Sequence, residues 1–238
     1  MEIATLFLGA LLLNLFAFIT IKIRPGIFKV KIYKPMVWNF KLSILPLLVL
    51  IANIVVFFLL SVLGAHSGIK IFSLFAHIIF WIGLLIWLLL LPNSGYLITE
   101  LNMNHREKDE KNVPIWYDIV SILSFALSGI VNTLANIVLI QLSFLTAFDP
   151  LKLTIANYYL LFFSGLGIIF LIVIGIFLGR TIRFNSWDIL HPVSFLKKIK
   201  THFAKPGSIK EFILYVTVNA VFFLIMYISF GIPFYFTK

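Results

Sequence analysis

Three short polar segments that flank long apolar runs carry the side chains best suited to chemistry. They cover residues 91–100, 113–118 and 179–188. Arg180 and Arg183 are three residues apart, so a continuing helix presents both on one face. Because a guanidinium group binds phosphate through two parallel hydrogen bonds, this pair predicts a phosphate clamp. The other candidate ligand-binding residues are Asn93, Asn185, Trp116 and Trp187, and the candidate catalytic carboxylates are Glu100, Asp118 and Asp188.

The same residue types also have structural explanations, which stay open. A tryptophan beside an apolar run suits ordinary anchoring at a membrane surface. An arginine beside an aspartate forms an ion pair without any ligand. No spacing among the carboxylates is diagnostic of a metal site, so we expect neither a metal nor a cofactor. The chain has no cysteine, which excludes thiol catalysis and thiolate metal ligation.

A stripe of polar residues follows Asp118 through the next apolar run. Its members recur every three or four residues and are Ser121, Ser124, Ser128, Asn132 and Asn136. On a helix these positions share one face, which should point into the bundle because lipid offers no hydrogen-bond partner. Two interpretations stay open. The stripe either lines a cavity that opens towards the cytoplasm or simply packs and hydrogen-bonds neighbouring helices.

The composition explains what positions these residues. Of 238 residues, 61% are hydrophobic and 12% are charged, whereas soluble domains have about 45–50% apolar and about 25% charged residues. Too little polar surface remains to cover a water-soluble globule, so a bilayer is the expected solvent. We expect residues 1–238 to form a single polytopic membrane domain.

Six apolar runs are long enough to cross a hydrocarbon core, which takes about 20 helical residues. Helices are expected because lipid cannot satisfy free backbone groups and because no period-two alternation suggests a barrel. The predicted fold class is therefore an all-α membrane protein with six transmembrane helices. The runs cover approximately residues 3–21, 42–63, 71–91, 115–140, 155–178 and 212–232.

The basic residues predict the orientation of these helices. Segments 22–41, 92–114 and 179–211 contain 16 of the 19 lysines and arginines. With six spans these segments share one side, which the positive-inside rule places in the cytoplasm, so both termini should lie outside. The net charge of +10 is thus spread over membrane-flanking loops, and we expect membrane lipids, not nucleic acid, as partners.

Two basic segments on the predicted cytoplasmic face should lie along the membrane surface. Residues 27–34 alternate apolar and basic side chains, as in an extended strip. Residues 194–203 place apolar side chains near one helical face and lysines elsewhere, which is typical of a short interfacial helix on anionic lipid.

The three polar segments also carry a family resemblance. The stretches LPN-x-x-YLITE (residues 91–100), P-x-WYD (residues 114–118) and GR-x-x-R-x-NSWD (residues 179–188) resemble a family of bacterial predicted membrane proteins classed as a domain of unknown function. The resemblance covers roughly residues 71–192. Glu100 stands where the family pattern is expected to have Asp, which lengthens the reach of that carboxylate by one methylene. The resemblance implies a multi-span protein of a bacterial inner (plasma) membrane and names no reaction.

The leading functional hypothesis is that the chain binds or handles a phosphate-bearing lipid or lipid-linked precursor at the cytoplasmic face. Arg180 and Arg183 would hold the phosphate, and Asp118 and Glu100 would act as acid, base or proton-coupling groups. One alternative is a small-solute or ion transporter that uses the polar stripe as its path. Another is a non-catalytic assembly partner of a second membrane protein.

Overall fold

The computed structural model describes residues 2–102, 113–148, 155–184 and 191–230. The chain forms two compact units, Met1–Phe148 and Asp149–Lys238.

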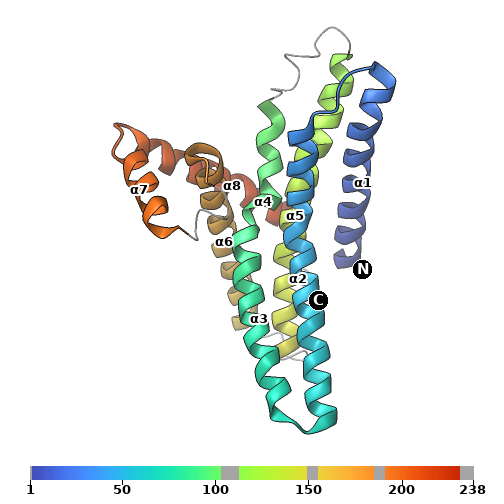
Figure 1. Cartoon of the computed structure of the whole chain (residues 1–238), viewed down its shortest axis with the longest axis vertical. Coiled ribbons are helices and arrows are strands. Elements are labelled where there is room, and N and C mark those ends of the chain that lie inside the picture. Colours follow the sequence, from blue (N-terminus) through green and yellow to red (C-terminus); the bar gives the residue numbers. More distant parts are fainter. Residues whose placement is uncertain (1, 103–112, 149–154, 185–190, 231–238) are drawn as a thin grey trace. The chain divides into compact units, whose positions relative to one another are not determined.

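Helices joined by short connectors make up the described residues of the first unit (Figure 1). Its elements are α1 (Glu2–Phe28), α2 (Lys34–Ser67), α3 (Lys70–Leu90), α4 (Pro92–Gly95), the 3₁₀ helix η1 (Tyr96–Asn102) and α5 (Ile115–Phe148). The second unit contains α6 (Ile155–Phe177), the π-helical turn η3 (Leu178–Ile182), α7 (Pro192–Phe203) and α8 (Ser208–Ser229).

The described residues contain six helices that are long and apolar enough to cross a membrane, which confirms the predicted all-helical, multi-span architecture. Several helices run past the apolar runs that predicted them. The second run covers residues 42–63, for example, whereas α2 covers 34 residues from Lys34 to Ser67. An apolar run marks only the part that lies in hydrocarbon, and nothing ends the backbone hydrogen bonding at its edge. The orientation of the helices and the interfacial placement of short segments stay predictions.

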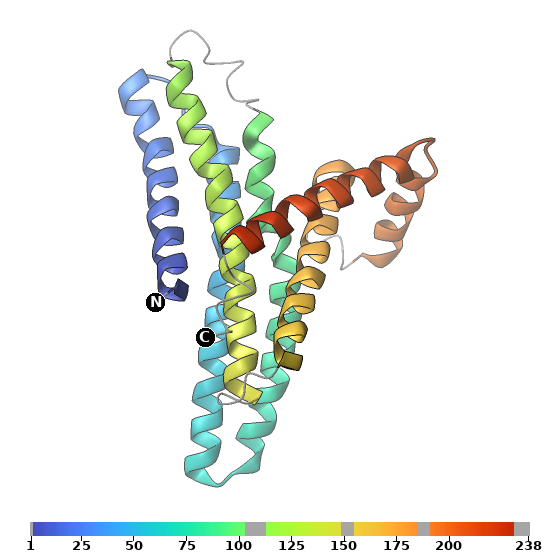
Figure 2. The ribbon, with the colours of Figure 1, turned by 180° about the vertical axis from the view of Figure 1, so that it is seen from behind.

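Helix α5 is the centre of the first unit. It packs against α1, α2, α4 and η1, and Figure 2 shows it running between α1 on one side and the α3–α4 segment on the other. Helix α1 turns a narrow stripe of small and apolar residues inward, while its other faces stay exposed. The buried members of this stripe are Leu6, Ala10, Ala17 and Ile21.

Helices α2 and α3 form an antiparallel hairpin, and α3 is then interrupted. The hairpin turns at Gly68, whose φ of 68° is left-handed and therefore suits glycine. Helix α3 ends at Leu90, and the chain continues through Pro92 into the short α4 and then η1. Proline has no N–H and disturbs the preceding turn. After this break, α4 and η1 pack against α5, and Leu97 of η1 is fully buried there.

Gly129 makes the contact between this segment and α5 possible. A Cβ atom at Gly129 would lie 2.8 Å from the Leu97 Cβ and 2.8 Å from the Ser94 carbonyl oxygen. One of these atoms is backbone, so the crowding cannot be relieved by turning a side chain. Glycine is therefore needed here for the close approach of two backbones.

We expect Gly129→Ala to lower the free energy of unfolding by about 1–3 kcal/mol, as overpacking does in well-packed interiors. Gly9→Ala is the matched control, because a Cβ at Gly9 of α1 would meet nothing within 4 Å. Alanine there should be neutral or stabilising by up to about 1 kcal/mol. Unfolding of both variants in detergent checks this, and equal stability of the two would contradict the close contact.

Candidate functional site

The polar stripe of α5 is buried along its whole length. Its five predicted members, Ser121, Ser124, Ser128, Asn132 and Asn136, are all in the buried class. The Ser124 and Ser128 hydroxyls donate to carbonyls of α5 itself, each 2.7 Å away. The Ser121 hydroxyl reaches α1, where it donates to the Thr20 Oγ1 at 3.1 Å. The stripe therefore faces protein, as predicted for a helix in lipid.

Asn132 ties α5 to two other helices. Asn132 and Asn14 of α1 exchange amide hydrogen bonds of 2.6 and 3.0 Å. The Asn132 Nδ2 also donates to the Ser43 Oγ of α2 at 3.1 Å. Ser43 in turn pairs with Ser94 of α4, because each hydroxyl donates to the other residue's carbonyl, at 3.2 and 2.9 Å.

Asn136 continues this network one helical turn further along α5. Its Oδ1 accepts the Trp87 indole N–H at 2.8 Å. Its Nδ2 donates to the Asn132 carbonyl at 2.8 Å and to the Ser94 Oγ at 3.4 Å. Both amide protons and the carbonyl oxygen of Asn136 are thus used. In this arrangement the network joins helices to one another, which is the packing interpretation of the stripe.

A buried ion pair lies where α1 and α5 meet. The Arg24 Nε donates to the Asp118 Oδ1 at 3.1 Å, with side chains only 8% and 2% exposed. The adjacent Tyr117 hydroxyl donates to the Thr20 carbonyl at 2.6 Å. Asp118 was predicted as a candidate acid or base, and the structure places an arginine of α1 beside it. Taking one member away would leave an uncompensated charge in the interior.

The other predicted residues of the first unit are less enclosed. Glu100 of η1 is half-buried, and its Oε1 accepts a hydrogen bond from the Asn39 Nδ2 at 2.7 Å. Asn93 is half-buried. Trp116 is 63% exposed, and its ring meets Tyr117 edge to face. The first two polar segments and the stripe therefore share one unit.

The arginine pair belongs to the second unit, together with the end of α6. Arg180 and Arg183 are both exposed. The α-helix ends at Phe177, and the pair lies on a π-helical turn that Arg183 closes with a left-handed φ of 60°. The expectation that a continuing α-helix presents both arginines on one face therefore does not apply. Asn185, Trp187 and Asp188 lie outside the described residues.

Aromatic contacts attach α7 to this turn. The ring of Phe184, which follows Arg183, lies 4.5 Å from the ring of Phe195 of α7, tilted by 33°. The Lys198 ammonium lies 5.3 Å from the centre of the Phe184 ring. A basic residue of α7 is thereby held beside the turn that carries the two arginines.

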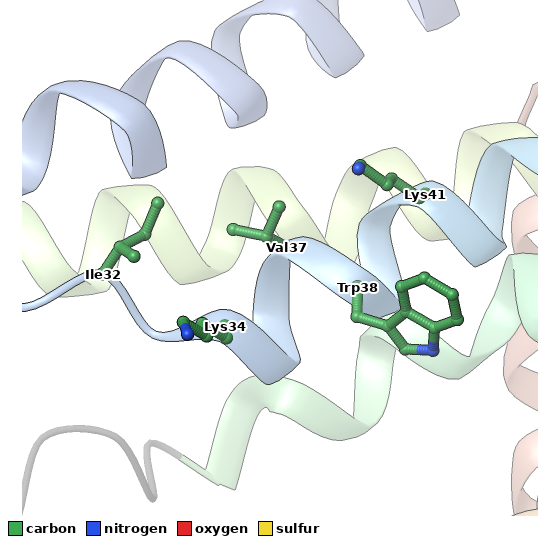
Figure 3. A pocket seen from close by; sticks show the side chains of 5 residues that line it. All are labelled: Ile32, Lys34, Val37, Trp38 and Lys41. Carbon is green, nitrogen blue, oxygen red and sulfur yellow. The ribbon is translucent and has the colours of Figure 1, made fainter.

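A basic hollow at the start of α2 was not predicted. It has a volume of about 250 Å³ and is lined by Lys34, Lys41, Trp38, Val37 and Ile32. Figure 3 shows these side chains projecting from the first turns of α2 and from the connector before it. Lys34, Trp38 and Lys41 follow the spacing of one helical face, which was a usable signal in the sequence.

Sequence reasoning also missed the partners of the predicted residues. These are Asn14, Arg24, Asn39, Ser43, Trp87 and, as a hydrogen-bonding centre, Ser94. Asn14 is a lone amide in an apolar run, which is a signal for an inward-facing position. Within residues 2–102, 113–148, 155–184 and 191–230, no group of three His, Asp or Glu side chains is placed to hold a metal ion.

Comparison with known families finds one match. The model of the family described as "Protein of unknown function (DUF1361)" matches residues 38–228, from the second turn of α2 to the last turn of α8. The match is wider than the resemblance over residues 71–192. No curated protein and no solved structure matches the chain.

Replacing either member of the Arg24–Asp118 pair should destabilise the first unit by about 3–5 kcal/mol, because the remaining charge is buried without its partner. Arg24→Met with Asp118→Leu should recover most of this loss, since two apolar side chains leave no charge to compensate. A double-mutant cycle of unfolding in mixed micelles measures the coupling. If the double variant loses the sum of the two single losses, the pair does not act as a unit.

Asn132→Leu should lower stability by about 2 kcal/mol, because three hydrogen bonds to other helices are lost and each averages about 0.6 kcal/mol in membrane proteins. Asn219→Leu on α8 is the matched control. The Asn219 Nδ2 donates to the Tyr215 carbonyl of its own helix, so the change should cost under about 0.5 kcal/mol. Unfolding of both variants is compared in the same detergent. A smaller loss for Asn132→Leu than for Asn219→Leu contradicts an interhelical role.

Proposed function

The chain belongs to the DUF1361 family of unknown function, and from its own residues we propose that it binds a phosphate-bearing lipid at the face predicted to be cytoplasmic. The observation that carries this proposal is the basic hollow at the start of α2. It combines two lysines with a tryptophan and an apolar wall. The lysines suit the phosphate of a lipid headgroup, and the apolar wall suits the carbon chain beside it.

The charge of the basic hollow favours an anionic ligand. Lys34 and Lys41 are exposed and flank the exposed Trp38. Lysine binds phosphate as a point charge with three donors. The rest of the wall is made by Val37 and Ile32, which suit the first carbons of an acyl or glycerol segment.

The depth of the hollow favours a lipid over a soluble anion. The apolar run of α2 begins at residue 42, directly after Lys41. Lys34 is seven residues before Lys41, which is about 10 Å along the helix axis at 1.5 Å per residue. The polar headgroup layer adds about 5–8 Å on each side of the hydrocarbon core. The two lysines thus cover the depth at which lipid phosphates lie, and tryptophan is typical of the same depth.

The arginine pair offers a second set of phosphate donors. Arg180 and Arg183 are exposed at the end of α6, and Lys198 lies beside the same turn. We include this pair in the proposal as a separate headgroup contact, made by the second unit alone. Asp118 and Glu100 already accept hydrogen bonds from Arg24 and Asn39. We therefore assign these two carboxylates to holding the helices in place and not to binding the lipid.

Transport along the polar stripe has less support. The amides of Asn132 and Asn136 spend their hydrogen bonds on protein partners, so a passing solute would have to displace them. An assembly role does not require lipid to bind in the basic hollow, so a measurement of lipid binding distinguishes the two roles.

We expect Lys34→Ala with Lys41→Ala to weaken binding of an anionic phospholipid at least tenfold. The purified protein is delipidated, titrated with phosphatidylglycerol or phosphatidylcholine in detergent, and the bound lipids are counted by native mass spectrometry. An Arg180→Ala, Arg183→Ala variant measures the share of the arginine pair in the same way.

Lys22→Ala with Lys31→Ala is the matched control. Both lysines are exposed, belong to the first unit and its predicted cytoplasmic side, and do not line the basic hollow. The control should bind phosphatidylglycerol as the unmodified protein does. Equal binding by the unmodified protein and by the Lys34/Lys41 and Arg180/Arg183 variants contradicts the proposal and favours the transport or assembly roles.

A further inference from the structure

A second hollow lies at the turn between α7 and α8, entirely within the second unit. It has a volume of about 770 Å³. The turn contributes Lys205 and Gly207, and the first three turns of α8 contribute Ile209, Lys210, Ile213, Leu214 and Thr217. It is called the α8 hollow below.

We propose that the α8 hollow binds one intact anionic phospholipid, with its phosphate at Lys205 and Lys210 and one acyl chain along α8. The proposal rests on the proposed function, since it assigns a second site for the same class of lipid. It goes further by naming the segment that holds the acyl chain.

The charges of the α8 hollow select an anion. Lys205 and Lys210 both belong to its lining and are exposed. Among the residues that the structure describes, this lining includes no Asp or Glu. Glu211 follows Lys210 in sequence but is not part of the lining. A phosphate at the mouth therefore meets two ammonium groups and no competing carboxylate.

The apolar wall selects a lipid and not a free phosphate ion. Ile213 lies one helical turn after Ile209, and Leu214 lies one turn after Lys210. Each of these two residues at the start of α8 therefore has an apolar neighbour further along the helix. Ile209, Ile213 and Leu214 are 59%, 57% and 62% exposed. A phosphate ion has five non-hydrogen atoms and fills little of a 770 Å³ hollow. An acyl chain lying along α8 covers this exposed apolar surface.

The turn that brings the two lysines together is held by its own hydrogen bonds. Gly207 has a left-handed φ of 83°, which glycine adopts without strain. The buried Ser208 donates its hydroxyl to the Lys205 carbonyl at 2.8 Å. The Glu211 N–H donates to the Gly207 carbonyl at 2.9 Å and starts α8. The backbone between Lys205 and Lys210 is thus held by hydrogen bonds within the protein.

The test counts phosphatidylglycerol bound to the full-length protein by native mass spectrometry. The unmodified protein should bind one molecule at the basic hollow and one at the α8 hollow, and the Arg180/Arg183 variant distinguishes these two from a molecule held at the arginine pair. Lys205→Ala with Lys210→Ala should weaken one of them at least tenfold. Ile213→Trp keeps both charges and fills the hollow, so it should weaken the same molecule. Lys197→Ala with Lys200→Ala on α7 removes the same charge from exposed positions outside the lining and should change binding by less than twofold.

Each outcome separates this inference from the proposed function. If Lys34→Ala with Lys41→Ala weakens one lipid and the Lys205/Lys210 variant behaves like its α7 control, only the α8 site is overturned. If the Lys205/Lys210 and Ile213→Trp variants each lose one lipid, the α8 site is supported whatever the first hollow does. Competition by inorganic phosphate at the concentration of the lipid would also overturn the α8 site, because the acyl chain would then contribute nothing. A thermal unfolding scan of each variant verifies that the loss is measured on folded protein.

Discussion

The hydrocarbon core of a membrane offers no hydrogen-bond partner, and the arrangement of the first unit depends on this constraint. The polar stripe of α5 consists of two asparagines and three serines that follow Asp118, and each of these side chains must find its partner within the protein. Ser124 and Ser128 use carbonyls of α5 itself, and the other partners come from α1, α2, α3 and α4, which pack along one face of α5. Gly129 belongs to the same arrangement, because a larger residue would hold the Ser94 segment away from the network.

The polar side chains in the core of the first unit have hydrogen-bond partners within the protein, so the proposed ligand contacts lie at the ends of helices. The amides of α5 are occupied, and Asp118 is matched by Arg24. Exposed lysines instead line hollows at the start of α2 and at the start of α8. Each place combines two lysines with branched aliphatic side chains. The two units thus present the same chemical combination on unrelated stretches of sequence.

The number of spanning helices was predictable because the length of an apolar run is a local property of the chain. The inward direction of the α5 stripe was predictable for the same reason. Its partners were not, because the rotation of α1 and α2 about their own axes is set by tertiary packing. Arg24 was counted only as a topology-setting charge, since the first apolar run ends at residue 21, but α1 continues to Phe28 and carries Arg24 inward.

The basic hollow escaped prediction for a related reason. Residues 27–34 alternate in polarity and were expected to be extended, so helical spacing was not applied to Lys34, Trp38 and Lys41. Within residues 27–34 the structure has no helix only at residues 29–33, and α2 begins at Lys34. The π-helical turn that carries Arg180 and Arg183 has no sequence signature of this kind, and in the structure Phe184 beside it contacts Phe195 of α7.

The partners of α5 have one further property in common, which is their order along the chain. Arg24, Asn14, Ser43, Trp87 and Ser94 all precede α5 in sequence. During synthesis the N-terminal part of a chain folds first. When the ribosome releases α5, the helices that satisfy its polar face are already in the bilayer. The least apolar of the six spanning helices is therefore the one whose entry is prepared by those made before it.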